Sequence, residues 1–236
     1  MKIITIRFFG DIRMIGILPA AGNARRIHGL PKFLLPIPNG FLLMRHLNMM
    51  HKADLSIGAR IGVTSVYYDV LAHIGYGVNI YRPYHHDTMT QTVLSALQFM
   101  PANEDVLFGL PDTYIEDDQC YAKLAAALAD CDVAVGVFLL GNHNHMSKLG
   151  MVAFTKDMKV VDVIEKPQTS YLEYAWGALA WQPQFWQYLQ PDMPHVGYAL
   201  MPAIEAGLDV RAVVMQGGYW DCGTFSEYAE LIKAIT

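Results

Sequence analysis

The feature that most constrains the fold of this sequence is an alternation of short apolar runs with helical patterns. Apolar runs bounded by Gly, Pro or polar residues predict strands at 15–18, 61–64, 78–81, 105–110 and 133–139. Helical spacing between these runs predicts helices at 41–51, 66–73, 90–100 and 119–129. Such alternation is typical of a mostly parallel sheet with helices on both faces. The sequence therefore predicts a single α/β domain.

The pattern changes after Gly150. Two apolar runs at 151–154 and 159–164 flank a polar turn and predict a β-hairpin. A dense run of aromatic residues at 171–189 is typical of a core or an interface, although such rings also line small-molecule pockets. The remaining expected elements are a helix, a strand and a final helix at 202–207, 210–214 and 227–235.

Composition excludes several classes of protein. Hydrophobic residues make up 53% of the chain and charged residues 17%, which supports a large core and argues against disorder. The net charge of −5 gives no reason to expect nucleic acid or an anionic membrane as a partner. No apolar run approaches the ~18 residues that a membrane span needs. The apolar and aromatic excess is compatible with a homo-oligomeric contact.

The cysteines and the first residues bear on the compartment. Cys120, Cys131 and Cys222 fit neither a zinc spacing nor a disulfide framework, so we expect free thiols in a reducing cytosol and a cytoplasmic protein. Residues 1–13 contain charges and lack the apolar segment of a signal peptide. We expect them to be an extension or an alternative start ahead of a domain at 14–236.

The first predicted strand ends in a loop that combines small residues with cations: Ala20, Ala21, Gly22, Asn23, Arg25, Arg26 and Lys32. Small residues let the backbone approach a ligand and turn its N–H groups toward an anion. The arginine fork and the lysine charge both suit phosphate oxygens. The loop has neither the G-x-x-x-x-G-K-[ST] nor the G-x-G-x-x-G pattern. These residues alone fit a phosphate-binding loop or a basic surface turn.

Four stretches, in order, resemble motifs of nucleotidyltransferases of the sugar-nucleotide pyrophosphorylase type. "PAAGNARRI…PKFLLPI" resembles the signature loop, and "VLFGLPDTYIE" the strand that delivers a metal-binding aspartate. "LGMVAFTKDMKVVDVIEKP" resembles the hairpin that ends at the sugar-phosphate site, and "GGYWDCGTFSEY" the segment with the second metal-binding aspartate. The resemblance spans about residues 14–232. It implies a single-domain Rossmann-like fold and transfer of a nucleoside monophosphate to a sugar 1-phosphate, with release of pyrophosphate.

The resemblance also implies roles on the nucleotide side. Arg26 and Lys32 would hold the triphosphate, and Asp112 and Asp221 would hold Mg²⁺. The small-residue loop would bind the nucleotide through Ala20, Ala21, Gly22 and Asn23. Gln91 is a plausible amide contact for the base, and His85 and His86 lie near the expected nucleotide edge.

On the acceptor side, the resemblance implies a site at the end of the hairpin. Lys166 would meet the phosphate of the sugar 1-phosphate and, with Arg26 and Lys32, would be a catalytic cation. Glu165 would bind sugar hydroxyls, and Gly177 would lie close to the sugar. The expected partners are thus a nucleoside triphosphate and a sugar 1-phosphate.

The sequence departs from the family pattern in ways that leave two other functions open. Ala24-Arg25 replaces the usual Gly-Thr of the loop, and the Arg-Arg pair also resembles cytidylyltransferases that act on a methylerythritol phosphate. Thr88 stands where the family often has glycine. One alternative is cytidylyl transfer to an alditol phosphate or to phosphocholine, whose quaternary ammonium aromatic rings can hold. The other is a non-catalytic nucleotide-binding protein on the same fold.

Overall fold

The structure is a computed structural model that describes residues 14–22, 27–53, 62–65, 67–72, 78–101, 103–141 and 146–236. The predicted extension at residues 1–13 lies outside the described residues. None of the helices within the described ranges is long and apolar enough to cross a membrane.

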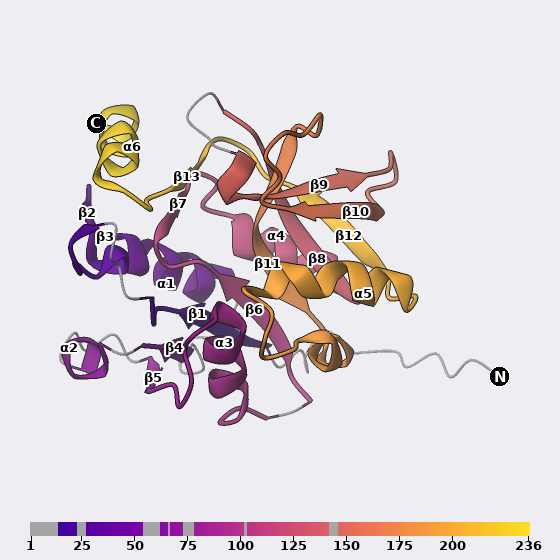
Figure 1. The fold of residues 1–236 in the computed structure, drawn as a ribbon, viewed down its shortest axis with the longest axis horizontal. Coiled ribbons are helices and arrows are strands. Elements are labelled where there is room, and N and C mark those ends of the chain that lie inside the picture. Colours follow the sequence, from indigo (N-terminus) through magenta and orange to yellow (C-terminus); the bar gives the residue numbers. More distant parts are fainter. Residues whose placement is uncertain are drawn as a thin grey trace.

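A nine-stranded sheet forms the centre of the fold, with the main strand order β10-β9-β11-β6-β1-β4-β5 (Figure 1). β8 also pairs with β11, and β12 pairs with β8. The strands are β1 (Met14–Pro19), β4 (Gly62–Thr64), β5 (Asn79–Tyr81), β6 (Asp105–Gly109), β8 (Val133–Leu139), β9 (Gly150–Phe154), β10 (Val160–Glu165), β11 (Tyr174–Trp181) and β12 (Val210–Val214). Strands β5, β4, β1 and β6 run parallel, and β11 runs antiparallel to β6, β8 and β9. The predicted α/β class is confirmed.

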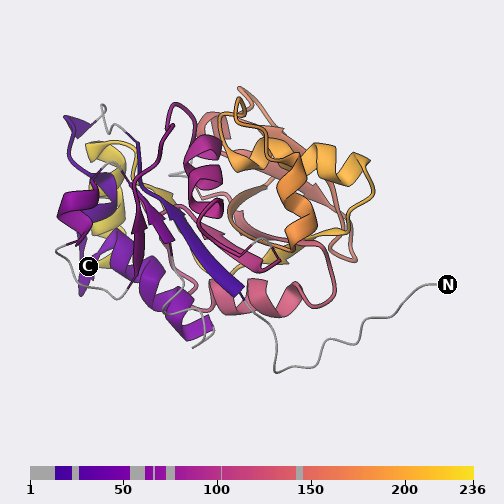
Figure 2. The same cartoon turned by 90° about the horizontal axis from the view of Figure 1, so that it is seen from below.

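Helices cover both faces of the sheet because the strands are apolar on both faces. Met14 and Leu18 of β1 pack in a core with α1 and α4, whereas Ile15 and Ile17 pack in a second core with α3. Figure 2 shows β1 between α1 on one side and α3 on the other. The helices are α1 (Leu42–Ala53), α2 (Tyr68–Ala72), α3 (Met89–Leu97), α4 (Cys120–Ala127), α5 (Leu200–Glu205) and α6 (Phe225–Ile235), with short 3₁₀ helices η2 (Lys32–Leu34), η4 (Met146–Lys148), η5 (Pro183–Tyr188) and η6 (Val196–Ala199).

The aromatic run at 171–189 contains a central strand that the sequence pattern did not predict. Its first part is β11, whose residues from Ala175 to Trp181 are all buried. The strand has neighbours on both edges and cores on both faces, so no polar residue alternates along it. Trp181 and Phe185 are fully buried in the core around α3. Most of the run therefore builds the core.

Two small sheets complete the fold. β2 (Pro36–Ile37) pairs with β3 (Gly40–Phe41), and β7 (Thr113–Ile115) pairs antiparallel with β13 (Tyr219–Asp221). In the second pair, Asp221 lies opposite Thr113. This pairing carries the end of the chain back to the turn that follows β6.

Candidate functional site

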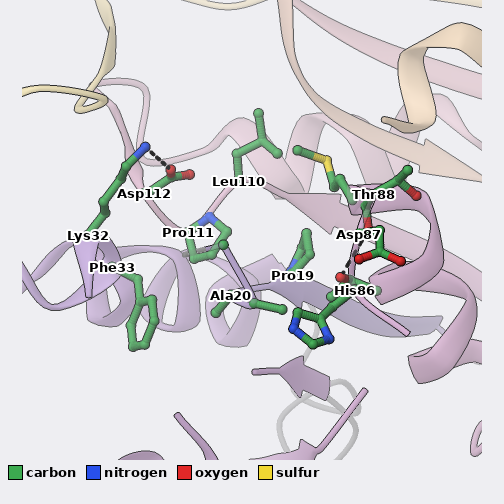
Figure 3. Close-up of a pocket in the computed structure, with 14 residues that line it drawn as sticks. Pro19, Ala20, Lys32, Phe33, His86, Asp87, Thr88, Leu110, Pro111 and Asp112 are labelled. Carbon is green, nitrogen blue, oxygen red and sulfur yellow. Dashed lines mark hydrogen bonds and ion pairs between the residues drawn. The ribbon is translucent and has the colours of Figure 1, made fainter. Parts of the chain in front are cut away.

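A pocket opens where the strand order reverses. From β1 the chain adds β4 and β5 on one side, and β6 then lies on the other side of β1. In open α/β sheets, the carboxyl ends of strands at such a reversal form a ligand crevice. A cavity of about 400 Å³ lies here, between the loop after β1 and the turn after β6 (Figure 3). Its lining includes Ala20, Ala21, Gly22, Lys32, His86, Thr88, Met89, Leu110, Pro111 and Asp112.

The loop after β1 presents backbone to this pocket. Ala20 and Ala21 are buried, and a Cβ added at Gly22 would meet no atom within 4 Å. The Ser65 hydroxyl donates to the carbonyl oxygen of Ala20 at 2.9 Å, which fixes the loop beside the end of β4. Asn23, which the sequence assigns to nucleotide binding, and Arg26, which it assigns to the triphosphate, lie outside the described residues, so their roles stay predictions.

A lysine and an aspartate lie side by side at one end of the pocket. Lys32, at the start of η2, points its Nζ toward Oδ2 of Asp112, 3.5 Å away (Figure 3). The Lys32 side chain is only 15% exposed, so its charge is directed into the cleft rather than to bulk water. A polyanionic ligand in this pocket would meet a largely desolvated cation.

A second cavity of about 350 Å³ continues from the first and shares four lining residues with it: Lys32, Met89, Leu110 and Asp112. It brings together four of the residues that the sequence assigns to the metal and the acceptor: Asp112, Asp221, Glu165 and Lys166. The two cavities therefore meet at the Lys32–Asp112 pair.

The two aspartates converge through the β7–β13 pairing. Thr113, the register partner of Asp221, directly follows Asp112, and the Cys222 N–H donates to the Asp112 carbonyl oxygen at 3.3 Å. Burial is the main cause that raises the pKa of the Tyr219 hydroxyl and of the Cys222 thiol, and the charges of Asp112 and Asp221 raise both pKa values further. Both carboxylates are thus close to the same groups.

This pair of carboxylates fits a hard divalent cation. Within the described ranges there is no cluster of three or more His, Cys, Asp or Glu side chains that could enclose a metal. Mg²⁺ is usually bound by one or two carboxylates and takes its other ligands from water and substrate phosphates. Asp112 and Asp221 match that donor set.

Lys166 lies at a strained position beside the second cavity. Its backbone has φ 50°, in the left-handed region that costs a non-glycine residue about 1–2 kcal/mol. Its N–H donates to the Leu149 carbonyl oxygen at 2.9 Å, which holds the turn at the end of β10. At this turn Lys166 is exposed and lines the second cavity. Backbone strain of this kind is often found at functional sites.

Glu165 belongs to a buried polar cluster that the sequence only partly indicated. Trp176 Nε1 donates to Glu165 Oε1 at 2.8 Å, and His195 Nε2 lies 3.3 Å from Glu165 Oε2. Burial raises the pKa of Glu165 to about 7, although the Trp176 hydrogen bond opposes the shift. Burial, with the positive charge of Lys166, lowers the pKa of His195 to about 4. No local motif around His195 indicated this position.

Two residues that the sequence assigns to ligand binding do not line either cavity. The Gln91 side-chain oxygen accepts from the Asp87 N–H at 3.0 Å, and the Gln91 N–H donates to the Thr88 hydroxyl at 3.1 Å, so both groups cap α3. Gly177 lies at an irregularity between β11 and β8, where an added Cβ would come within 2.5 Å of the Tyr219 ring. Gly177 therefore lets Tyr219, which does line the cavity, pack closely.

Lys148 lines the second cavity but was not predicted. Its ammonium forms an ion pair with Glu227, which lies at the start of α6. The Thr224 hydroxyl accepts from the Glu227 N–H at 3.3 Å, which caps the N-terminus of α6, and donates to the Glu227 carboxylate at 2.8 Å. The pair joins the hairpin side of the cavity to the segment after Asp221.

A buried histidine supports the turn that carries Asp112. His46 of α1 contacts the Thr113 carbonyl oxygen through Nε2 at 3.0 Å and the Tyr121 hydroxyl of α4 through Nδ1 at 2.7 Å. Because a carbonyl oxygen can only accept, Nε2 carries the proton and Nδ1 accepts from Tyr121. Burial lowers the pKa of His46 to about 4, so this ring is neutral at pH 7.

The His46 contacts predict a pH dependence of stability. A histidine near pKa 6.5 when unfolded and about 4 when folded stabilises the fold above pH 6.5 and loses that contribution as the pH falls toward 4. The shift corresponds to about 3 kcal/mol. Urea unfolding at pH 7, 6, 5 and 4 measures the free energy of unfolding of the wild type and of His46→Gln. Between pH 7 and pH 4, this free energy should fall by about 3 kcal/mol more for the wild type than for the variant. A stability difference that is constant with pH would contradict the neutral, buried ring.

Comparisons with known proteins agree with the fold. The profile of the MobA-like NTP transferase domain matches residues 16–206. No curated protein matches the sequence. A solved structure from Bacillus anthracis, described as a glucose-1-phosphate thymidylyltransferase in complex with a sucrose, has a TM-score of 0.78 at 18% identity and covers 94% of this chain and 95% of its own.

Two other solved structures are similar to a comparable extent. A UDP-glucose pyrophosphorylase complexed with UDP-glucose has a TM-score of 0.76 at 16% identity, over 94% of this chain and 98% of its own. A UTP-bound UGPase from Acinetobacter baumannii has a TM-score of 0.72 at 16% identity, over 94% of this chain and 93% of its own. At these identities the likeness establishes the fold.

Proposed function

The chain belongs to the family of MobA-like NTP transferase domains, and on that premise we propose that it transfers a nucleoside monophosphate from a nucleoside triphosphate to a sugar 1-phosphate. The observation that carries the proposal is the junction of two cavities at Lys32 and Asp112. One cavity suits the nucleotide, because it lies beside the small-residue loop. The other suits the acceptor, because it contains Glu165 and Lys166.

In this reaction an oxygen of the acceptor phosphate forms a bond to the α-phosphorus of the triphosphate. The bond from that phosphorus to the oxygen bridging the α- and β-phosphates breaks, and pyrophosphate leaves with the electron pair. Two polyanions must approach each other, so positioning and charge neutralisation account for most of the catalysis. No covalent nucleophile is needed, and burial raises the pKa of the Cys222 thiol, which keeps it unreactive.

The chain's own residues divide this work. Backbone N–H groups after β1 would bind the triphosphate, and Lys32 would neutralise charge where the two substrates meet. Lys166 would bind the acceptor phosphate from the other side. Asp112 and Asp221 would hold Mg²⁺, which when bound stabilises the charge that develops on the phosphate oxygens.

The aromatic run at 171–189 offers little support for a phosphocholine acceptor. A quaternary ammonium needs several ring faces around it. Of the aromatic run at 171–189, Trp176 lines the acceptor cavity, whereas Trp181 and Phe185 are core residues and Tyr171 is 85% exposed. The run therefore forms no cage in the described part of the chain.

A substrate screen tests the proposal. The protein would be incubated with Mg²⁺, each of the common ribonucleoside and deoxythymidine triphosphates, and a panel of sugar 1-phosphates, with pyrophosphate as the readout. We expect release with at least one sugar 1-phosphate and none after chelation of the metal. Turnover with CTP and phosphocholine or an alditol phosphate alone would favour the cytidylyltransferase alternative. Calorimetric binding of a triphosphate with no turnover in any pairing would favour a non-catalytic protein.

A further inference from the structure

Two buried side chains that line the acceptor cavity carry polar atoms without a hydrogen-bond partner among the described residues. The side chains of His195 and Glu165 are 7% and 5% exposed, and both line the cavity. Glu165 Oε2 and both ring nitrogens of His195 make no hydrogen bond to any described residue, although Nε2 and Oε2 lie 3.3 Å apart. Buried polar atoms are costly to leave unpaired, and such atoms beside a cavity indicate that a ligand completes them.

The surrounding residues hold this pair in place. Glu165 is fixed through Oε1 by Trp176, and the ring of His195 packs at 4.7 Å from the ring of Tyr198. A Cβ added at Gly197 would lie 2.1 Å from Glu165 Oε1, and one added at Gly150 would lie 2.5 Å from Oε2. Both glycines are therefore needed for the backbone to pass so close to the carboxylate.

The segment that carries His195 is also tied to the nucleotide side. The Met89 N–H donates to the Pro194 carbonyl oxygen at 3.1 Å, and the Thr88 hydroxyl donates to the Pro191 carbonyl oxygen at 2.9 Å. Thr88 and Met89 line the first cavity. His195 is thus positioned by the same helix start that borders the nucleotide pocket.

The hydrogen-bonding properties of His195 and Glu165 determine which kind of ligand group can bind to both of them. A neutral imidazole offers one N–H donor and one acceptor nitrogen, and the Glu165 carboxyl accepts when ionised and can also donate when protonated. A hydroxyl can donate to one atom and accept from another, so it can satisfy both side chains together. A trimethylammonium group has no hydrogen to donate, and a carboxylate on the ligand would face the carboxylate of Glu165.

We propose that His195 is a specificity-determining residue that, together with Glu165, binds a free hydroxyl of the acceptor sugar. This inference rests on the proposed function, and it identifies a sugar hydroxyl as the group by which the cavity distinguishes one acceptor from another. It makes sugar 1-phosphates that retain this hydroxyl the preferred acceptors, and their analogues deoxygenated at that position poor ones.

The experiment compares a hexose 1-phosphate with its monodeoxy analogues, using turnover and calorimetric binding in parallel. The wild type should discriminate against one analogue by roughly 10²-fold or more, because a missing hydroxyl leaves buried polar groups unpaired. In His195→Phe, which keeps a ring against Tyr198 but has no ring nitrogen, that ratio should fall to below about 10-fold, with the KM for the triphosphate unchanged. His195→Asn, which keeps a donor and an acceptor, should retain part of it.

The controls separate this inference from the proposed function. His51→Ala, on α1 and outside both cavities, should leave the ratio at its wild-type value. The inference would be overturned, with turnover still present, by either of two results for His195→Phe. One is an unchanged discrimination ratio, and the other is an equal loss of activity for the parent sugar 1-phosphate and for every analogue. The two proposals can also fail separately. If His195→Phe loses discrimination between the sugar 1-phosphates in calorimetric binding, while the wild type turns over none of them, the inference is supported and the proposed transfer reaction is refuted.

Discussion

Replacing Asp112 with Asn is expected to lower the turnover number by roughly 10³-fold while leaving the fold intact. The substitution keeps the size of the side chain and removes its charge. It would deprive a bound metal of one of two carboxylate ligands, and the nearby Lys32 of its ion-pair partner at 3.5 Å. Steady-state kinetics with Mg²⁺ at several concentrations measure the effect, and circular dichroism with thermal unfolding checks the fold.

A matched control exists on the surface. Asp118 pairs with Lys52 at 3.8 Å, and both side chains are more than half exposed. Asp118→Asn should therefore change neither turnover nor the apparent affinity for Mg²⁺. Asp221→Asn should resemble Asp112→Asn, and the double variant should be little worse than either, since the two carboxylates would act on one metal. A turnover number within threefold of the wild type would remove Asp112 from the metal site.

Lys32→Met is expected to lower kcat/KM by about 10²–10³-fold for both substrates. Methionine keeps most of the aliphatic length but removes the charge at the junction of the two cavities. Because the Lys32 side chain is only 15% exposed, water would replace its charge poorly. Separate titrations of the triphosphate and of the sugar 1-phosphate measure the two effects.

Lys52→Met is the corresponding control, because Lys52 also pairs with an aspartate but is 61% exposed and outside both cavities. Its kinetics should match those of the wild type. An effect of Lys32→Met on only one substrate would mean that Lys32 serves one cavity rather than their junction, which would contradict the arrangement proposed here.

Much of the fold could be predicted because local patterns determined it. The strands from 15–18 to 133–139 were expected at nearly their observed positions, since each is an apolar run with clear ends. β11 was not, because a strand that is buried on both faces and composed of Ala and aromatic residues has no polar alternation. The capping of α3 by Thr88 and Gln91 was visible as a T-x-x-Q pattern, and weighing it would have suggested a structural role for Gln91.

The residues of the candidate site also fall into those that the sequence indicated and those that it did not. Asp112, Asp221, Glu165 and Lys166 were found because each lies in a motif, and the structure lines one cavity with all four. His195, Lys148 and His46 were not found, because their relevance comes from partners far away in the sequence: Glu165, Glu227 and Thr113. Only tertiary contacts reveal such residues.

The pairing of β7 with β13 makes the proposed metal site depend on two segments that lie far apart in the sequence. The large sheet contains neither strand, so its own pairing does not place Asp221 next to the turn after β6. A ligand that needs both carboxylates would therefore bind only after this small sheet has closed, and its binding during refolding would report when that closure occurs.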